Sequence, residues 1–340
     1  MEKKNEPIGQ HTVPKCYLKN FNIKVIHKKN RTKYFVDVFD KKGERKEYNQ
    51  RDINGICKIN EFYTILKLPD EEKRCLEKLF SKTIETDYGL IYPLLINKNQ
   101  IRLSNAQKVS LISFVITQFF RTSILTNFFI QVAEDMVKHA SRLSQLKKGI
   151  NKIQTINGNH FDFSSQNINE IIKEEKISAK DNINIVKLQL ALNILKLRKE
   201  DIVLITKVHP SHFLITSDAP VFFLGNPTDT NSIIKMPINH EYIFSLLPKA
   251  RFSEFNSKEI FRSEMEEEFS SLETTSNNLH QVSKSERFII GKEENIKSAL
   301  LLESNINADN FIAQANSFTS DTVLLAKGLG YDLGIDIKNL

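Results

Sequence analysis

The sequence predicts an α+β fold in which short-stranded, mixed or antiparallel sheets pack against a long central helical bundle. Two observations indicate this class. Apolar residues recur at helical spacing through the middle of the chain, as at Val186, Leu190, Ile194 and Leu197. Short runs of β-branched and aromatic residues, separated by Gly, Pro and Asn, lie on both sides of this helical part.

Length and composition are those of one domain with an ordinary hydrophobic core. The chain has 340 residues, of which 40% are hydrophobic and 26% are charged, as in typical globular proteins. We expect a single domain over 1–340, with a β-rich part at 1–68, a helical part at 69–200 and a second β-rich part at 201–330. The polar, Asn-rich stretch at 150–182 is expected to be an insertion in the helical part.

The N-terminal part is expected to begin with a short helix and to continue as strands. Apolar positions within 13–21 fit one helical face. Residues 23–66 are expected to be β: 32–40 alternate loosely and a turn follows at 41–44, which predicts a hairpin and further short strands. Pro69, followed by three acidic residues, is expected to open the next helix.

Two long helices are expected in the helical part. Ser104 and Gln107 have the spacing of a capping box, and the apolar helix that follows is expected to continue towards Leu146. Residues 183–197 carry the apolar stripe of an amphipathic helix.

The C-terminal part should be mostly short strands. A buried-strand pattern at 202–205, a turn at 209–211 and an apolar run from Phe213 together indicate a hairpin. Further strands are expected at 231–236, 242–247, 288–291 and 322–326, and helices at 264–272 and 308–315.

Net charge leaves the kind of partner open. The formal charge is +7, from 48 basic and 41 acidic residues, and it favours an anionic partner such as nucleic acid, a nucleotide or a membrane surface. The alternative is diffuse lysine, because Lys, Asn and Ile are frequent everywhere, as AT-rich coding would produce. Clustering of charge, and not its total, marks a binding surface.

Three further features predict a cytoplasmic protein without a membrane span. Cys16, Cys57 and Cys75 are too few for a disulfide framework and lack paired metal-ligand spacing. The charged N-terminus lacks the apolar core of a signal peptide. The longest apolar run, 111–133, contains Arg121, which is costly inside a bilayer.

Several well-known catalytic motifs are absent from the sequence. It has no phosphate-cradling glycine loop, no His-Glu-x-x-His helix and no Gly-x-Ser-x-Gly nucleophile elbow. Candidate functional residues must therefore be sought among isolated polar side chains beside apolar elements.

The strand that starts at Phe213 ends in such side chains. Ser217 and Asp218 follow its apolar residues and precede Pro220, at a strand end where rigid scaffolds often present working groups. Asp218 could equally be a turn residue that bonds its own backbone. His11 precedes the first expected helix and could face a cavity, or it could be a capping histidine.

The helical part supplies two carboxylates, an amide and a cation. Glu77 and Glu85 are eight residues apart and project within about 80° of each other on an ideal helix, where the alternative to a functional pair is two solvated carboxylates. Gln118 and Arg121 face the same way in an apolar helix, where a guanidinium needs a carboxylate or phosphate partner. A buried ion pair that braces the fold and a clamp for an anionic ligand both satisfy this need.

Several of these motifs resemble those of one family. The segment 11–21 resembles the opening signature of domain-of-unknown-function family 4238 (DUF4238), and 216–221 resembles its central Thr-Ser-Asp-x-Pro-Val element. Matches to its other motifs involve Glu77 with Glu85, Gln118 with Arg121, Pro237 with Tyr242, and Gln314 with Phe318. The resemblance covers nearly the whole chain and implies a bacterial, intracellular protein.

Two departures from the family pattern bear on structure. Ala219 stands where the family more often has Asn, so no side-chain amide is expected there. Ser123 stands where proline is usual, which favours a helix that runs on without a kink.

Taken together, these residues predict a nuclease-like hydrolase acting on a phosphodiester or nucleotide-type anionic substrate. His11 would be the general acid–base, Asp218 its orienting carboxylate or a metal ligand, and Glu85 a second ligand or base. Gln118, Arg121 and Ser217 would bind the substrate. If a metal is used, it would be Mg²⁺ or Mn²⁺ held by Glu85 and Asp218.

Two alternatives use the same residues without catalysis. The cluster could cradle a nucleotide, nucleic acid or protein partner, as in a binding component of a bacterial defence or toxin system. It could also be a structural lock, in which Arg121 pairs with Glu85 or Asp218 in the core.

Overall fold

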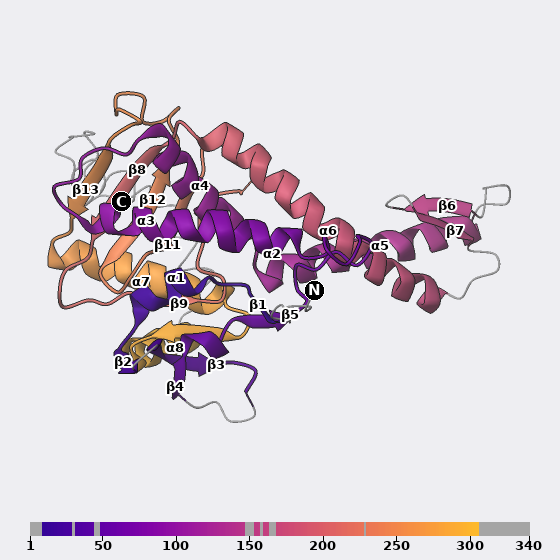
Figure 1. Ribbon diagram of the computed structural model, residues 1–340, viewed down its shortest axis with the longest axis horizontal. Helices are drawn as coiled ribbons and strands as arrows, with labels where there is room; N and C mark the ends of the chain where they lie inside the picture. The colour runs from indigo at the N-terminus through magenta and orange to yellow at the C-terminus, as the bar shows by residue number, and fades with distance from the viewer. Residues whose placement is uncertain are drawn as a thin grey trace.

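The computed structural model of the chain describes residues 9–28, 31–43, 48–146, 153–156, 159–162, 168–227 and 229–305. These residues form helices and mostly antiparallel sheets, so the predicted α+β class is confirmed. Figure 1 shows a body of sheets and helices, from which α5 (Ser123–Leu146) and α6 (Ile168–Arg198) extend towards the ladder of β6 (Ile153–Ile156) and β7 (Asn159–Asp162). The elements expected at 308–315 and 322–326, and the motif at Gln314 and Phe318, lie outside the described residues.

The first sheet joins strands from both ends of the described chain. Its order is β2 (Lys24–Lys28), β3 (Arg31–Asp40), β14 (Phe288–Gly291) and β9 (Thr216–Ser217), and β4 (Tyr48–Asp52) also pairs with β3. All these pairings are antiparallel. Ile289 lies opposite Phe39 on one side and Ser217 on the other, so β14 fixes β3 relative to β9.

The second sheet contains the remaining strands of the C-terminal part. Its order is β10 (Phe222–Leu224), β11 (Ile233–Pro237), β12 (Tyr242–Leu247), β8 (Ile202–Lys207) and β13 (Ile260–Glu264), with β13 parallel to β8 and the other pairs antiparallel. Residues 202–206 of β8 are all buried, which explains their nearly continuous apolar sequence.

The expected hairpin between 202–205 and the run from Phe213 is wrong. β8 pairs with β12 and β13, whereas β9 pairs with β14 in the other sheet. After the intervening turn the chain enters the first sheet, where Thr216 and Ser217 pair with Ile290 and Ile289 of β14.

A short ladder positions the N-terminal end. β1 (Gly9–His11) pairs with β5 (Lys58–Asn60), which places His11 opposite Lys58. The next residue, Thr12, donates its N–H to the carbonyl of Cys57 at 2.8 Å. Pro14 then caps the short helix α1 (Lys15–Leu18), which continues as the 3₁₀ turn η1 (Lys19–Phe21).

The first helix of the helical part starts later than Pro69. Residues 70–74 form turns, and the helical segment comprises α2 (Cys75–Leu79), the π-helical turn η3 (Phe80–Ile84) and α3 (Glu85–Ile96). A tertiary hydrogen bond explains the delay, because the carbonyl of Lys73 accepts the N–H of Ile65 at 2.9 Å.

The next helix, α4 (Asn105–Phe120), begins and ends at polar residues. Ser104 and Gln107 form both hydrogen bonds of the expected capping box. The expected unkinked continuation is wrong, since α4 stops before Arg121 and meets α5 at an angle of 55°. The Arg121 carbonyl accepts a hydrogen bond from the Tyr63 hydroxyl at 3.3 Å, so a tertiary contact takes the place of a continuing helix there.

The helices pack in pairs. α3 contacts α4, α4 contacts α6, and α5 contacts α6. These pairwise contacts do not define one central bundle, which stays a prediction. Within the described residues, no helix by itself has the length and apolar character required to cross a membrane, although the bent pair of α4 and the start of α5 has both. In the C-terminal part, α7 (Glu267–Lys284) is longer than the helix expected at 264–272 and packs against α8 (Glu293–Asn305).

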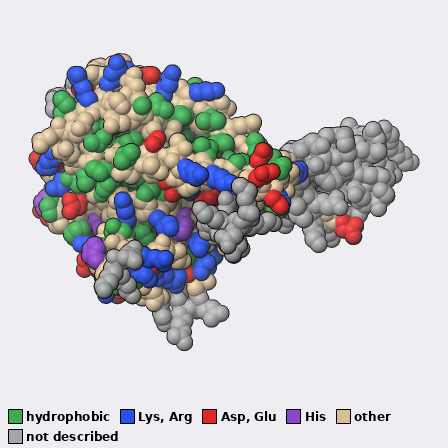
Figure 2. Space-filling model, in the orientation of Figure 1, with side chains coloured by type: hydrophobic (Ala, Val, Ile, Leu, Met, Phe, Trp, Pro, Cys, Tyr) green, Lys and Arg blue, Asp and Glu red, His purple; other side chains and the backbone are tan. Residues whose placement is uncertain are grey.

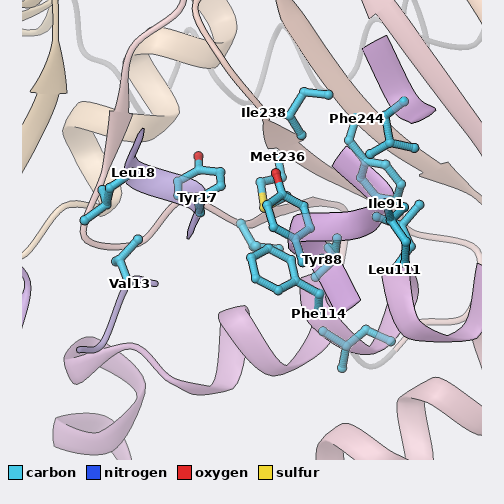
Figure 3. Packing of buried hydrophobic residues seen from close by; sticks show 14 of the residues in the cluster. Val13, Tyr17, Leu18, Tyr88, Ile91, Leu111, Phe114, Met236, Ile238 and Phe244 are labelled. Atoms are coloured by element: carbon cyan, nitrogen blue, oxygen red, sulfur yellow. The ribbon is translucent and has the colours of Figure 1, made fainter. Parts of the chain in front are cut away.

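The largest core cluster lies where α1, α3, α4 and the second sheet meet (Figure 3). Tyr88 and Phe114 stack with ring centroids 3.7 Å apart, and Figure 3 shows Met236 beside them. The buried Tyr17 hydroxyl lies 2.7 Å from both the Thr216 hydroxyl and the Pro237 carbonyl. A single tyrosine of α1 therefore bridges the two sheets.

Surface charge is mixed on the face that Figure 2 shows. Lys and Arg side chains there are scattered among acidic and uncharged ones and do not form one continuous stripe. On this face, the basic excess has the diffuse distribution that composition alone would produce.

Candidate functional site

Three segments that are distant in sequence meet at Arg121. They are the end of β1 at His11, the π-helical turn followed by Glu85, and the C-terminal end of α4. The side chains of Gln118 and Arg121 both reach the β1 end, where they contact the carbonyls of Thr12 and His11. The structure thus brings together four of the predicted residues: His11, Glu85, Gln118 and Arg121.

The Arg121 guanidinium is buried and has an acceptor on each of its three nitrogens. Nη1 lies 2.9 Å from Glu85 Oε1, Nη2 donates to the His11 carbonyl at 2.7 Å, and Nε donates to the Tyr63 hydroxyl at 3.1 Å. The Phe80 ring covers one part of the group, with its centroid 4.5 Å from Cζ. Burial opposes the charge, but Tyr63 and Glu85 outweigh it and raise the pKa of Arg121.

Gln118 anchors the same side of α4. Its Nε2 donates to the Thr12 carbonyl at 3.0 Å, which fixes the residue that follows His11. Its Oε1 is buried and has no hydrogen-bond partner among the described residues. A buried acceptor without a donor is costly, so this oxygen is available to a ligand donor or a water.

The His11 imidazole is held in its neutral form. Burial, followed by the positive charges of Lys15, Lys58 and Arg121, lowers the pKa of His11 to about 4. Its Nε2 is buried and has no hydrogen-bond partner among the described residues. A neutral imidazole with an uncommitted ring nitrogen can act as a base or as a ligand.

Glu77 belongs to the same cluster, although it was not among the predicted site residues. Burial raises the pKa of Glu77, Arg121 lowers it, and Glu85 raises it further. One carboxylate oxygen, Oε2, is buried and has no hydrogen-bond partner among the described residues. Its eight-residue spacing from Glu85 was the available signal, but the π-helical turn between them changes the angle that an ideal helix would give.

Cys16 and Tyr63 complete the polar surroundings. Burial, with a smaller contribution from Glu85, raises the pKa of the half-buried Cys16 thiol to about 12. Burial also raises the pKa of Tyr63 to about 12, although Arg121 opposes the rise. Both groups therefore stay protonated at neutral pH, so they can donate hydrogen bonds but are poor nucleophiles.

Asp218 and Ser217 lie in a different environment. Asp218 accepts hydrogen bonds from three consecutive backbone N–H groups, those of Glu286, Arg287 and Phe288, at 3.0, 2.7 and 3.1 Å. Burial raises the pKa of Asp218, and these bonds limit the rise. Within the described part of the chain, none of its hydrogen bonds goes to His11, so Asp218 does not orient the imidazole as predicted.

Ser217 is likewise occupied by structural contacts. Its hydroxyl donates to Gln281 Oε1 at 2.7 Å and accepts the Ala219 N–H at 3.2 Å. Ser217 thus fastens the end of β9 to α7, and Asp218 fastens it to the start of β14. The expected turn, in which Asp218 would bond its own backbone, is also wrong, because its carboxylate accepts the N–H groups of Glu286, Arg287 and Phe288.

The expected metal site does not form from its two predicted ligands. Glu85 pairs with Arg121, whereas Asp218 binds backbone amides elsewhere. In the ranges that the structure describes, no three His, Cys, Asp or Glu side chains are arranged to hold a metal ion. The geometry of these residues therefore does not fit a Mg²⁺ or Mn²⁺ centre on Glu85 and Asp218.

Comparison with known proteins places the chain in a family without an assigned activity. The model of the family described as "Protein of unknown function (DUF4238)" matches residues 9–295. No curated protein and no solved structure gives a match. Because the family match covers nearly all of the described residues, the chain belongs to the DUF4238 family.

Proposed function

We propose that His11, Glu77, Glu85 and Arg121 form the acid–base site of a hydrolase that acts on phosphodiester or nucleotide-type anionic substrates. One observation carries this proposal. His11 Nε2 and Glu77 Oε2 are both buried without a hydrogen-bond partner among the described residues, and the charge of Arg121 lowers the pKa of both groups. Uncommitted titratable groups around a fixed cation are typical of a site that handles charged substrates.

His11 is suited to the role of general base. With a pKa of about 4, it is neutral at physiological pH and can accept a proton from an attacking water. Because a base with so low a pKa has little driving force to take a proton, Arg121 must supply part of the rate enhancement. The same cationic surroundings that lower the pKa of His11 would attract an anionic substrate.

Glu77 is suited to the complementary role of general acid. Its pKa is raised by burial, so the protonated form persists to higher pH than for an exposed glutamate. Two groups whose surroundings move their pKa values in opposite directions, a lowered histidine and a raised carboxyl, define an acid and a base.

Arg121 would stabilise the negative charge of the transition state. The guanidinium has five N–H donors, and each of its nitrogens already has one acceptor, so donors remain for a substrate oxygen. Glu85, whose side chain is 20% exposed, would hold Arg121 in place in the free protein and give way in part to an incoming phosphate.

The test is turnover combined with a measurement of folding. The wild-type protein is incubated with bis(p-nitrophenyl) phosphate, single-stranded RNA and DNA, and nucleotides, with EDTA, Mg²⁺ or Mn²⁺. We expect His11→Gln and Glu77→Gln to lower the rate on the cleaved substrate by about 100-fold or more, with little change in Tm. Glu72→Gln, on an exposed residue near Glu77, is the matched control.

One observation favours a second candidate function, non-catalytic binding of a nucleotide, nucleic acid or protein partner. Arg121 already has acceptors from Glu85, Tyr63 and the His11 carbonyl, which is the arrangement of a braced group as much as of a reactive one. A substrate-dependent increase in Tm without turnover would support binding. Activity that survives in both His11→Gln and Glu77→Gln would overturn the hydrolytic proposal.

A further inference from the structure

A cavity lies beside the α4–α5 bend. Its volume is about 550 Å³, and its wall is formed by the bend, the segment from Ala219 to Pro227 and the C-terminal part of α7. Phe119 and Thr122 face this cavity, whereas Gln118 and Arg121 face the candidate site. The volume falls within the range of small-molecule sites in proteins.

The interior of this cavity is apolar and held in place by aromatic contacts. Phe119 and Phe223 lie edge to face with ring centroids 4.8 Å apart. Phe222 stacks on His280 at 4.4 Å, and His280 Nδ1 is bonded to the Ser276 carbonyl at 2.8 Å. The rings are therefore fixed by the fold, and a ligand would not have to order them.

The small side chain of Ala219 leaves part of this space open. Ala219 lines the cavity, and its N–H is fixed by the Ser217 hydroxyl at 3.2 Å. Because the backbone is held there, a larger side chain at position 219 would project into the cavity instead of moving away from it. A larger residue at position 219 can therefore fill the cavity without changing the residues at its rim.

The rim of the cavity carries a positive charge. Lys284 is exposed and, of the residues that the structure describes, no carboxylate lies within ion-pair distance of its ammonium group. The nearby Glu286 is already occupied, since it pairs with Lys42 at 2.7 Å and accepts hydrogen bonds from Ser123 and Asn127. An uncommitted cation above an apolar interior suits a ligand with one anionic end.

We propose that this cavity binds an acyl carboxylate, with the hydrocarbon chain among Phe119, Phe222 and Phe223 and the carboxylate at Lys284. A neutral chain would lack the ion pair at the rim, and a cationic chain would be repelled by Lys284. The proposal does not depend on the function of the His11 and Arg121 site.

The experiment is isothermal titration calorimetry of the full-length protein with three probes of equal chain length, decanoate, decanol and decyltrimethylammonium. Decanoate should bind most tightly. Lys284→Gln should weaken decanoate about three- to fivefold, as expected for one exposed ion pair, and leave decanol unchanged. Ala219→Leu should abolish binding of both, and Lys297→Gln, on an exposed lysine of α8, is the control.

Each outcome decides the question. Equal binding of decanoate and decanol, or a Lys284→Gln variant that binds decanoate as tightly as wild type, would overturn the assignment of an anionic ligand. Failure of the wild type to bind any probe, or decanoate binding that survives in a folded Ala219→Leu variant, would overturn the cavity as the site. Loss of hydrolytic activity has no bearing on either result.

Discussion

Arg121 Nη1 lies 2.9 Å from Glu85 Oε1, and this ion pair joins the C-terminal end of α4 to the first residue of α3. The Arg121 side chain is 3% exposed, whereas that of Glu85 is 20% exposed. The buried charge of Arg121 therefore needs a counter-charge. The partly exposed carboxylate of Glu85 can exchange this contact for one with solvent or a ligand.

Removing the carboxylate of this pair should destabilise the fold. Glu85→Gln leaves a buried guanidinium without its counter-charge, which costs about 3 kcal/mol for pairs of this kind. The free energy of unfolding in urea checks this. Lys98→Gln is the control, because its pair with Glu264 is exposed and should contribute little. A Glu85→Gln variant as stable as wild type would show that the ion pair is not a brace.

Lys187 should make the free energy of unfolding rise with pH in the alkaline range. Burial and the nearby Arg121 lower the pKa of Lys187 from 10.5 to about 7, so between these values the unfolded state binds more protons than the folded state. Stability contributed by this group therefore rises with pH from about 7 to about 10, by at most about 1.4 kcal/mol per pH unit. Lys187→Met should remove this slope and stabilise the protein at pH 7.

The structural basis for this prediction is the lack of a carboxylate beside Lys187. Its ammonium group contacts the Thr126 hydroxyl at 2.6 Å and lies over the Phe62 ring, and no acidic partner lies within ion-pair distance among the described residues. Urea unfolding of wild type and Lys187→Met at several pH values would measure the difference. Parallel curves for the two proteins would contradict the lowered pKa.

His11 should also make the free energy of unfolding rise with pH, in this case in the acidic range. Its pKa is lowered from 6.5 to about 4, so protonation of the unfolded state precedes that of the folded state as the pH falls. The contribution is present above pH 6.5 and is lost between about 6.5 and 4, by at most about 1.4 kcal/mol per pH unit. Titration of the imidazole signals by NMR, assigned with His11→Gln, measures this pKa directly, and a midpoint near 6.5 would refute it.

Asp218 should act on stability and not on chemistry. Asp218→Asn removes one of two oxygens that serve three backbone N–H groups of 286–288, together with the charge, and should cost about 2–4 kcal/mol. Ser217→Ala, which loses the hydrogen bond to Gln281, should cost about 1 kcal/mol. Differential scanning calorimetry checks both. An Asp218→Asn protein with unchanged Tm but no activity would return this residue to the catalytic site.

Local features of the fold could be predicted because their causes lie within a few residues. The capping box of Ser104 and Gln107, the strand at 242–247 and the strand at 288–291 all depend on side chains next to the element. Strand partners could not be predicted in this way. β9 pairs with β14, about seventy residues away, and nothing in the sequence between 202 and 221 distinguishes this from a hairpin.

The same distinction between local and distant causes applies to the candidate site. Arg121 had to find a counter-charge because of where it lies in an apolar helix, and the structure supplies Glu85. The partners of Asp218 are backbone amides, which every residue possesses, so no sequence pattern marks them. Glu77 was left out of the predicted site because its spacing from Glu85 does not distinguish a buried carboxylate from a solvated one.

The pairing of β3 with β14 has a consequence for synthesis of the protein. While the ribosome is still translating the helical part, residues 37–40 of β3 are already made but their partners at 288–291 are not. Until those partners emerge, this edge of β3 exposes unpaired backbone groups and can join another nascent chain. We therefore expect truncated products that end before residue 288 to aggregate, and expression of the full chain to depend on chaperones that bind early.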